Sequence, residues 1–133
     1  DMTNLGQYLH DFREGIMRSI VTNFSAVVIS FDEENLTATI QPQVNNKPDI
    51  HTPSTARPKI ENVPVMFYRL RYNDKDPLTE REYTPFLKAG DVVMCTVSYR
   101  SMDGAKSGGT YDGQMSRIMN MQDAVIVGII YGA

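Results

Sequence analysis

The chain has 133 residues, with 13 Lys+Arg, 16 Asp+Glu, a formal net charge of −3 and 41% hydrophobic residues. This length is typical of one domain, and the hydrophobic content is sufficient for a packed core. The slight acidic excess argues against a protein that binds the nucleic-acid backbone, because such proteins concentrate positive charge. The sequence also has no apolar run of the roughly 18 residues that span a bilayer, and no basic-then-apolar leader at its start.

Few residues support catalysis or metal binding. Cys95 is the single cysteine, and His10 and His51 are the two histidines. One cysteine cannot build a disulfide framework or, alone, a zinc site, and neither histidine belongs to a recognisable catalytic motif. We therefore expect no enzymatic activity, no metal, no cofactor and no small-molecule substrate. Cys95 lies within an apolar run and is expected to be a buried, unreactive thiol.

Residues 1–22 are predicted to form a helix. Apolar side chains recur at spacings of three and four, which places them on one side of about four helical turns. Gly6 and Gly15 each weaken such a helix by about 1 kcal/mol relative to alanine. The helix therefore needs a surface to pack on, either its own domain or a neighbouring subunit. The apolar residues are Leu5, Tyr8, Leu9, Phe12, Ile16 and Ile20.

A β-hairpin is predicted next. From residue 24 the hydrophobic period changes to two, and alternation continues to Phe31 and again from Leu36 to Gln41. The four residues 32–35 between these runs are polar and favour turns. Two alternating runs separated by about four turn residues are typical of antiparallel strands joined by a tight connection.

Three more strands are predicted, separated by long loops. Four prolines between residues 42 and 59 remove backbone donors and indicate a loop, and residues 69–87 form a second polar loop. Pro64 indicates that the third strand lies at a sheet edge or contains a bulge. The run 92–99 is apolar on both faces, as in a well-buried strand. The three strands are predicted at residues 63–68, 92–99 and 123–130.

One helix and five short strands that begin with a hairpin fit a mainly β protein with an oligonucleotide/oligosaccharide-binding (OB) fold, which is a five-stranded Greek-key barrel. We assign residues 1–22 to the helix and residues 23–133 to the barrel, within a single domain. Closing the sheet into a barrel would remove edges that otherwise promote aggregation.

Five ordered segments carry a resemblance to a known family. Together they resemble the N-terminal OB domain of the central spike (cell-puncturing) proteins of contractile-tailed phage baseplates, over residues 24–130. The segments are Phe31–Asp32 with Leu36–Pro42, then Ile60–Phe67, Leu87–Val93, Ser98–Asp103 and Met121–Gly128.

The resemblance implies a structural protein of the virion. In that family the OB domain is a homotrimer that caps the tail tube and takes part in penetration of the host envelope, and a trimeric β-helix commonly follows it. The expected partners are therefore further copies of the chain, tail tube or hub proteins, and a spike tip or β-helix segment, with indirect envelope contact. The expected location is the tail baseplate, after synthesis in the host cytoplasm. No His-x-His pair of a metal-capped tip is present, so we expect either the adaptor part of a spike or a short spike whose tip is another protein.

Two groups of residues are candidates for a role in this assembly. Gly90 and Asp91 are expected to form a turn into the fourth strand, because glycine accepts turn conformations and aspartate accepts backbone hydrogen bonds. Asp123 and Gly128 are expected to act likewise around the last strand. The candidates for subunit or tube contacts are Leu5, Tyr8, Leu9, Phe12, Ile16, Tyr68, Tyr83 and Phe86.

The alternative function is a module that binds single-stranded nucleic acid. OB folds of this type combine a basic groove with aromatic side chains on which bases stack. The segment Tyr68-Arg69-Leu70-Arg71-Tyr72 has this composition, whereas the net charge and the lack of tryptophan argue against it. Nucleic acid is therefore not expected as a partner.

Overall fold

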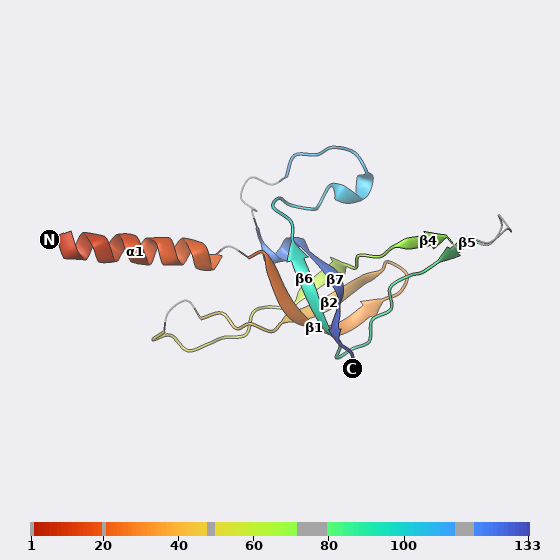
Figure 1. Cartoon of the computed structure of the whole chain (residues 1–133), viewed down its shortest axis with the longest axis horizontal. Helices are drawn as coiled ribbons and strands as arrows, with labels where there is room; N and C mark the ends of the chain where they lie inside the picture. Colours follow the sequence, from red (N-terminus) through yellow and green to blue (C-terminus); the bar gives the residue numbers. More distant parts are fainter. Residues whose placement is uncertain (1, 20, 48–49, 72–79, 114–118) are drawn as a thin grey trace.

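The computed structural model describes residues 2–19, 21–47, 50–71, 80–113 and 119–133, in which one long helix lies outside a twisted β-sheet (Figure 1). The strands follow the alternating apolar runs, because alternation buries one face of each strand. The elements are α1 (Met2–Ser19), β1 (Asn23–Asp32), β2 (Thr37–Pro42), β3 (Ile60–Pro64), β4 (Arg69–Arg71), β5 (Glu80–Glu82), β6 (Val92–Val97), β7 (Ala124–Tyr131) and the short 3₁₀ turns η1 (Ala105–Ser107) and η2 (Met121–Asp123).

The main sheet has five strands in the order β3-β2-β1-β6-β7, and every neighbouring pair is antiparallel. The predicted hairpin corresponds to β1 and β2. Because β6 and β7 follow on the other side of β1, the strand order is that of an OB-like fold. The prediction of a mainly β protein with one N-terminal helix and long loops is therefore confirmed.

The barrel, however, is not closed by a continuous ladder. Among the described residues, the two edges of the sheet meet at a single parallel bridge, which pairs Val65, the residue after β3, with Ile126 of β7. There the Met66 N–H donates to the Ile126 carbonyl over 2.9 Å. The expectation that closure removes all sheet edges is thus wrong. OB folds are commonly only partly closed, and here β3 has just five residues, ends at Pro64 and lies at an edge as its proline predicts.

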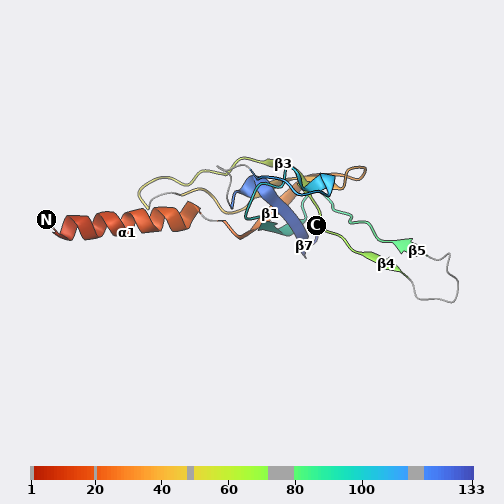
Figure 2. The ribbon, with the colours of Figure 1, turned by 90° about the horizontal axis from the view of Figure 1, so that it is seen from above.

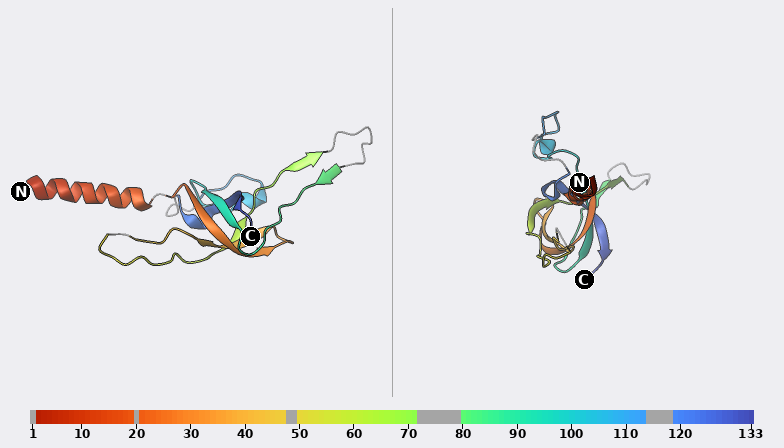
Figure 3. Two further views of the ribbon diagram at one scale, coloured as in Figure 1. Left: turned by 60° about the horizontal axis from the view of Figure 1, so that its bottom comes forward. Right: turned by 90° about the vertical axis from the view of Figure 1, so that its left-hand side faces the viewer.

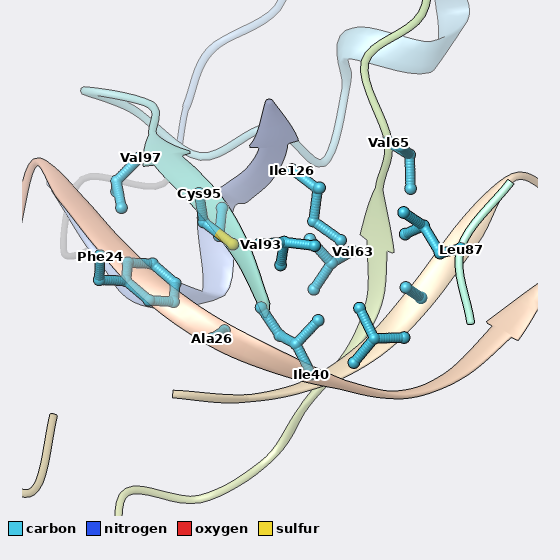
Figure 4. Packing of buried hydrophobic residues seen from close by; sticks show 13 residues of the cluster. Phe24, Ala26, Ile40, Val63, Val65, Leu87, Val93, Cys95, Val97 and Ile126 are labelled. Carbon is cyan, nitrogen blue, oxygen red and sulfur yellow. The ribbon is translucent and has the colours of Figure 1, made fainter. Parts of the chain in front are cut away.

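The core lies inside the curved sheet (Figure 4). A bulge between Val28 and Ser30 shifts the alternation of β1, so Phe31 also packs against the core from the far end of the strand. Strand β6 buries one face only, because Met94 is exposed. The buried cluster consists of Phe24, Ala26, Val28, Ala38, Ile40, Val63, Val65, Leu87, Val93, Cys95, Val97, Ala124 and Ile126.

The turn between β1 and β2 is organised by Asp32. Its carboxylate accepts hydrogen bonds from the Asn35 side-chain amide at 2.8 Å, and from the backbone N–H groups of Glu34 at 3.0 Å and Asn35 at 3.3 Å. These bonds, chiefly the one from the Asn35 amide, hold the pKa of Asp32 below its ordinary value. An aspartate at the end of the strand therefore fixes the start of the hairpin connection.

The two long loops contain more structure than predicted. In the first, Asn46 and Thr55 form an isolated antiparallel bridge. In the second, β4 and β5 form a separate two-stranded sheet, so the prediction of a polar loop over residues 69–87 is wrong for these six residues. This hairpin extends from the barrel on the side opposite to α1 (Figure 2), and Figure 3 shows the same arrangement from another direction.

Candidate functional site

The described part of α1 exposes one apolar face to solvent. We call the surface formed by Leu5, Tyr8, Leu9, Phe12 and Ile16 the apolar face of α1; all five side chains are exposed. None of the extensive contacts between the described elements involves α1. Of the two possibilities that the sequence leaves open, packing of this face on its own barrel is therefore not observed.

The apolar face of α1 contains a pair of stacked aromatic rings, and polar side chains lie on the other side of the helix. The Tyr8 and Phe12 rings are stacked, with centroids 6.5 Å apart and an interplanar angle of 13°. On the other side of the helix, the Gln7 amide donates to the Asp11 carboxylate over 2.9 Å. The helix therefore separates an aromatic and aliphatic surface from a hydrated one, as amphipathic helices do.

The other predicted contact residues lie at the base of the β4–β5 hairpin. Tyr68 immediately precedes β4, and Tyr83 immediately follows β5; because Arg69 pairs with Glu82, one more step of the ladder places the two tyrosines opposite each other. Tyr68, Tyr83 and nearby Phe86 are all exposed. The candidate contact residues thus form two groups on opposite sides of the barrel.

A third exposed apolar surface was not predicted from the sequence. Strand β7 lies at the sheet edge, and its last residues expose Val127, Ile129, Ile130 and Tyr131. The run 123–130 was interpreted as an ordinary apolar strand. In the structure β7 extends past the point where it meets the end of β3, so its distal half has no strand on that side to cover it.

Gly90 and Asp91 form the turn that leads into β6. Gly90 has φ of +95°, and the Asp91 N–H donates to the Lys88 carbonyl over 3.1 Å. Positive φ at the third residue is the geometry of a type II turn and favours glycine. Glycine thus stands where the backbone is left-handed, and aspartate stands where the turn needs a hydrogen-bond acceptor.

The Asp91 side chain joins this turn to residue 133. Its carboxylate accepts from the backbone N–H of Lys88 and from that of Ala133, each at 2.8 Å, and only 3% of the residue is exposed. These two hydrogen bonds hold the pKa of Asp91 below its ordinary value, and the bond from the Lys88 N–H has the larger effect. The carboxylate therefore stabilises the folded state in its ionised form.

Asp123 and Gly128 have different positions. The buried Asp123 carboxylate accepts from the Met102 N–H over 3.1 Å, and its carbonyl accepts from the Ser98 N–H over 3.1 Å. Asp123 therefore fastens the loop after β6 to the start of β7. Gly128 does not lie in a turn: it is inside β7 opposite Met94, next to an irregularity in the register.

The groups considered for catalysis are dispersed. Burial raises the pKa of the Cys95 thiol to about 12, while His10 and His51 are exposed. In the described ranges, no group of three or more His, Cys, Asp or Glu side chains could hold a metal ion. Within those ranges, too, no helix has the length and apolar character to cross a bilayer.

One open pocket, with a volume of about 630 Å³, lies between the loop before β3 and the segment around η2. Arg57 and Lys59 contribute positive charge to its lining, and Glu61 and Asp103 contribute negative charge. Because the two signs are mixed, the pocket does not concentrate charge for one class of ligand. The exposed apolar surfaces are the stronger candidates for function.

The fold and these surfaces together describe a small OB-like domain suited to protein contacts. The family model described as "Phage protein Gp138 N-terminal domain" matches residues 24–128, and the chain belongs to this family. The matched segment contains the whole barrel except the first residue of β1 and the end of β7, and it begins after α1. The comparison with curated proteins gave no match. Membership of this family supports the conclusion that the chain is a structural protein of a phage and a component of the virion. It also suggests a role other than catalysis.

Proposed function

We propose that this chain is a subunit of a homotrimeric central spike or hub in the baseplate of a contractile phage tail. Its barrel would cap the tail tube and take part in penetration of the host envelope. The observation that carries the proposal is the family match over residues 24–128, which coincides with an OB-like barrel. That match is to a phage domain, and the fold is the one expected of a spike N-terminal domain.

The distribution of exposed apolar residues supports an assembled state. Monomeric proteins rarely expose large contiguous apolar patches, and such patches commonly mark protein interfaces. Here the apolar face of α1 and the distal half of β7 are both exposed in the isolated chain. Further copies of the chain would cover such surfaces, and the aromatic residues at the base of the β4–β5 hairpin would remain for tube or hub proteins.

The role would be mechanical. A domain between a tail tube and a spike tip, or a β-helix segment, needs shape and stable contacts in place of reactive groups. The described site has this character, because its hydrogen-bonded carboxylates at Asp91 and Asp123 fix loops and its cysteine is buried. Contact with the envelope would be made through the tip, and the working location would be the virion baseplate.

The mass in solution tests the trimer. One chain has a mass of 15.0 kDa, so a trimer has three times this mass, 45 kDa. Sedimentation equilibrium of the full chain should give 45 kDa at micromolar concentrations and above. A mass of one chain throughout that range would contradict the proposed trimer. Immunogold labelling of intact phage particles should place the protein at the tube end, and labelling of the capsid or tail fibres would contradict the location.

Single-stranded nucleic acid binding is the alternative that an OB topology raises. OB modules bind oligonucleotides over the strands that correspond to β2 and β3. The polar side chains of these two strands that reach the surface are neutral or acidic: Thr37, Thr39, Gln41, Glu61 and Asn62. We therefore expect no change in the fluorescence anisotropy of a labelled oligonucleotide at low salt. Binding that weakens steeply with salt would favour the alternative.

A further inference from the structure

The spacing along α1 points to a specific mode of association. Leu5, Leu9, Phe12 and Ile16 are separated by four, three and four residues. Alternating spacings of four and three are those of the a and d positions in the heptad repeat, by which helices pack side by side in a coiled coil. The four residues therefore occupy the a and d positions of a heptad pattern, and the charged residues Asp11, Arg13 and Glu14 occupy other positions.

The apolar face is wider than the strip that two helices need. At 3.6 residues per turn, each residue turns the helix by 100°, so the face from Tyr8 to Leu9 covers about 100°. Tyr8 occupies the g position beside Phe12, with which it is stacked. An apolar face of a, d and g positions is typical of helices in a bundle, whereas a dimeric coiled coil needs the a and d positions alone.

The helix also needs a partner for its own stability. It has 18 residues, which is near the length at which isolated helices become marginal in water, and it contains Gly6 and Gly15. A β-carbon added at either glycine would have no atom within 4 Å in the isolated chain. Neither glycine is therefore explained by contacts within its own protomer.

We infer that α1 is a self-association element: three copies pack in parallel through the apolar face of α1 and form a helical bundle at one end of the assembly. The inference rests on the trimer proposed above and names the surface that holds it together. The helices must be parallel, because in a closed ring of three subunits one rotation axis relates all copies. The bundle lies outside the segment 24–128 that defines the family, so this contact belongs to the α1 extension of this chain.

The inference is tested with one charge placed at two positions of equal exposure. Leu9 and Met17 are 55% and 56% exposed in the isolated chain, but Met17 lies about 100° around the helix from Ile16. Leu9→Glu places a carboxylate from each subunit at the bundle axis and should weaken trimer formation by roughly 100-fold or more. Met17→Glu should leave the dissociation constant within about threefold of wild type, because glutamate at that position stays hydrated.

Sedimentation equilibrium of the full chain separates the outcomes. The inference is supported if the wild-type chain is a trimer, the Leu9→Glu variant dissociates and the Met17→Glu variant remains a trimer. If both variants remain trimers with wild-type affinity, the α1 bundle is overturned while the proposed trimer stands. A monomeric wild-type chain overturns both. Because α1 lies outside the barrel, the β-sheet circular dichroism signal of each variant should match wild type, which shows that dissociation does not come from unfolding.

Oxidation of Leu5→Cys tests which surface faces the apolar face of α1. In a parallel bundle the same residue of each copy meets at the axis, so oxidation should give chains linked through residue 5. The native thiol does not compete, because Cys95 is fully buried. If Leu9→Glu dissociates the trimer but the Leu5→Cys variant forms no link at residue 5, α1 packs against a neighbouring barrel and the bundle is overturned.

Discussion

Shortening Ile126 to alanine tests how the barrel holds together where its ladder is open. Ile126 is 0% exposed, and its backbone forms a bridge with Val65, the residue after β3; among the described residues this is the only bridge that joins the two edges of the sheet. The change leaves this backbone bridge in place and removes three methyl or methylene groups from the core. Their transfer term is about 2.4 kcal/mol at about 0.8 kcal/mol per group. The cavity that remains adds to this loss, and Ile→Ala changes in cores cost about 2–5 kcal/mol in total.

We therefore expect Ile126→Ala to lower the free energy of unfolding by about 3–4 kcal/mol. For a domain of this size, about 1 kcal/mol corresponds to roughly 4 °C in the melting temperature, so the midpoint should fall by about 12–16 °C. Urea titration followed by circular dichroism measures the free energy, and differential scanning calorimetry measures the midpoint.

The matched control is the same truncation at Ile50, which is 77% exposed in the first long loop. Ile50→Ala should change the free energy of unfolding by no more than about 0.5 kcal/mol, as surface substitutions usually do. Equal losses for the two variants, or a loss below about 1 kcal/mol at Ile126, would refute the argument that packing at Ile126 stabilises the open side of the barrel.

Three other predictions follow from buried groups and from the turn before β6. Cys95, with its pKa raised to about 12, should have about one thiolate in 10,000 thiols at pH 8 and should react with iodoacetamide only when the protein unfolds; mass spectrometry that finds rapid labelling of the folded chain would contradict its burial. The lowered pKa of Asp91 means that its stabilising effect is present above the ordinary pKa of 3.8 and is lost as the pH falls through the lower folded-state value. Asp91→Asn should therefore lower stability at pH 7 and reduce the acid-induced loss in urea titrations, with the contribution of Asp32 remaining; an unchanged pH profile would contradict this. Gly90→Ala should cost about 1–2 kcal/mol because of its positive φ, whereas Gly109→Ala, with no atom within 4 Å of the added carbon, should be nearly neutral in the same titration.

The sequence predicted the parts of the fold in which local pattern and tertiary environment agree. Strands β1 and β2 bury alternate residues, apart from the bulge in β1, and are joined by residues that favour turns, so their pairing could be inferred locally. The β4–β5 hairpin could not, because each strand has only three residues, of which two are charged in β4 and all three in β5. Short polar strands have no hydrophobic period, and their pairing depends on where the barrel places the two ends of the loop.

The candidate site was predicted to the extent that exposure follows from residue type and spacing. The periodicity of α1 identifies its apolar face, but the sequence does not say whether that face packs on its own barrel, because both arrangements need the same pattern. The exposed half of β7 was missed for a related reason. An apolar run of eight residues has the same appearance whether a facing strand covers it or not, and coverage here depends on how far β3 extends.

The connection between α1 and the sheet has a mechanical consequence. The helix leads through residues 21–22 into β1, which is the central strand and is hydrogen-bonded to β2 on one side and to β6 on the other. Ladder hydrogen bonds lie perpendicular to the strands, so tension applied along β1 loads many of them at once in shear. Tension on an edge strand directed away from the sheet would break them one after another. A pull on the helix is therefore resisted by both ladders together.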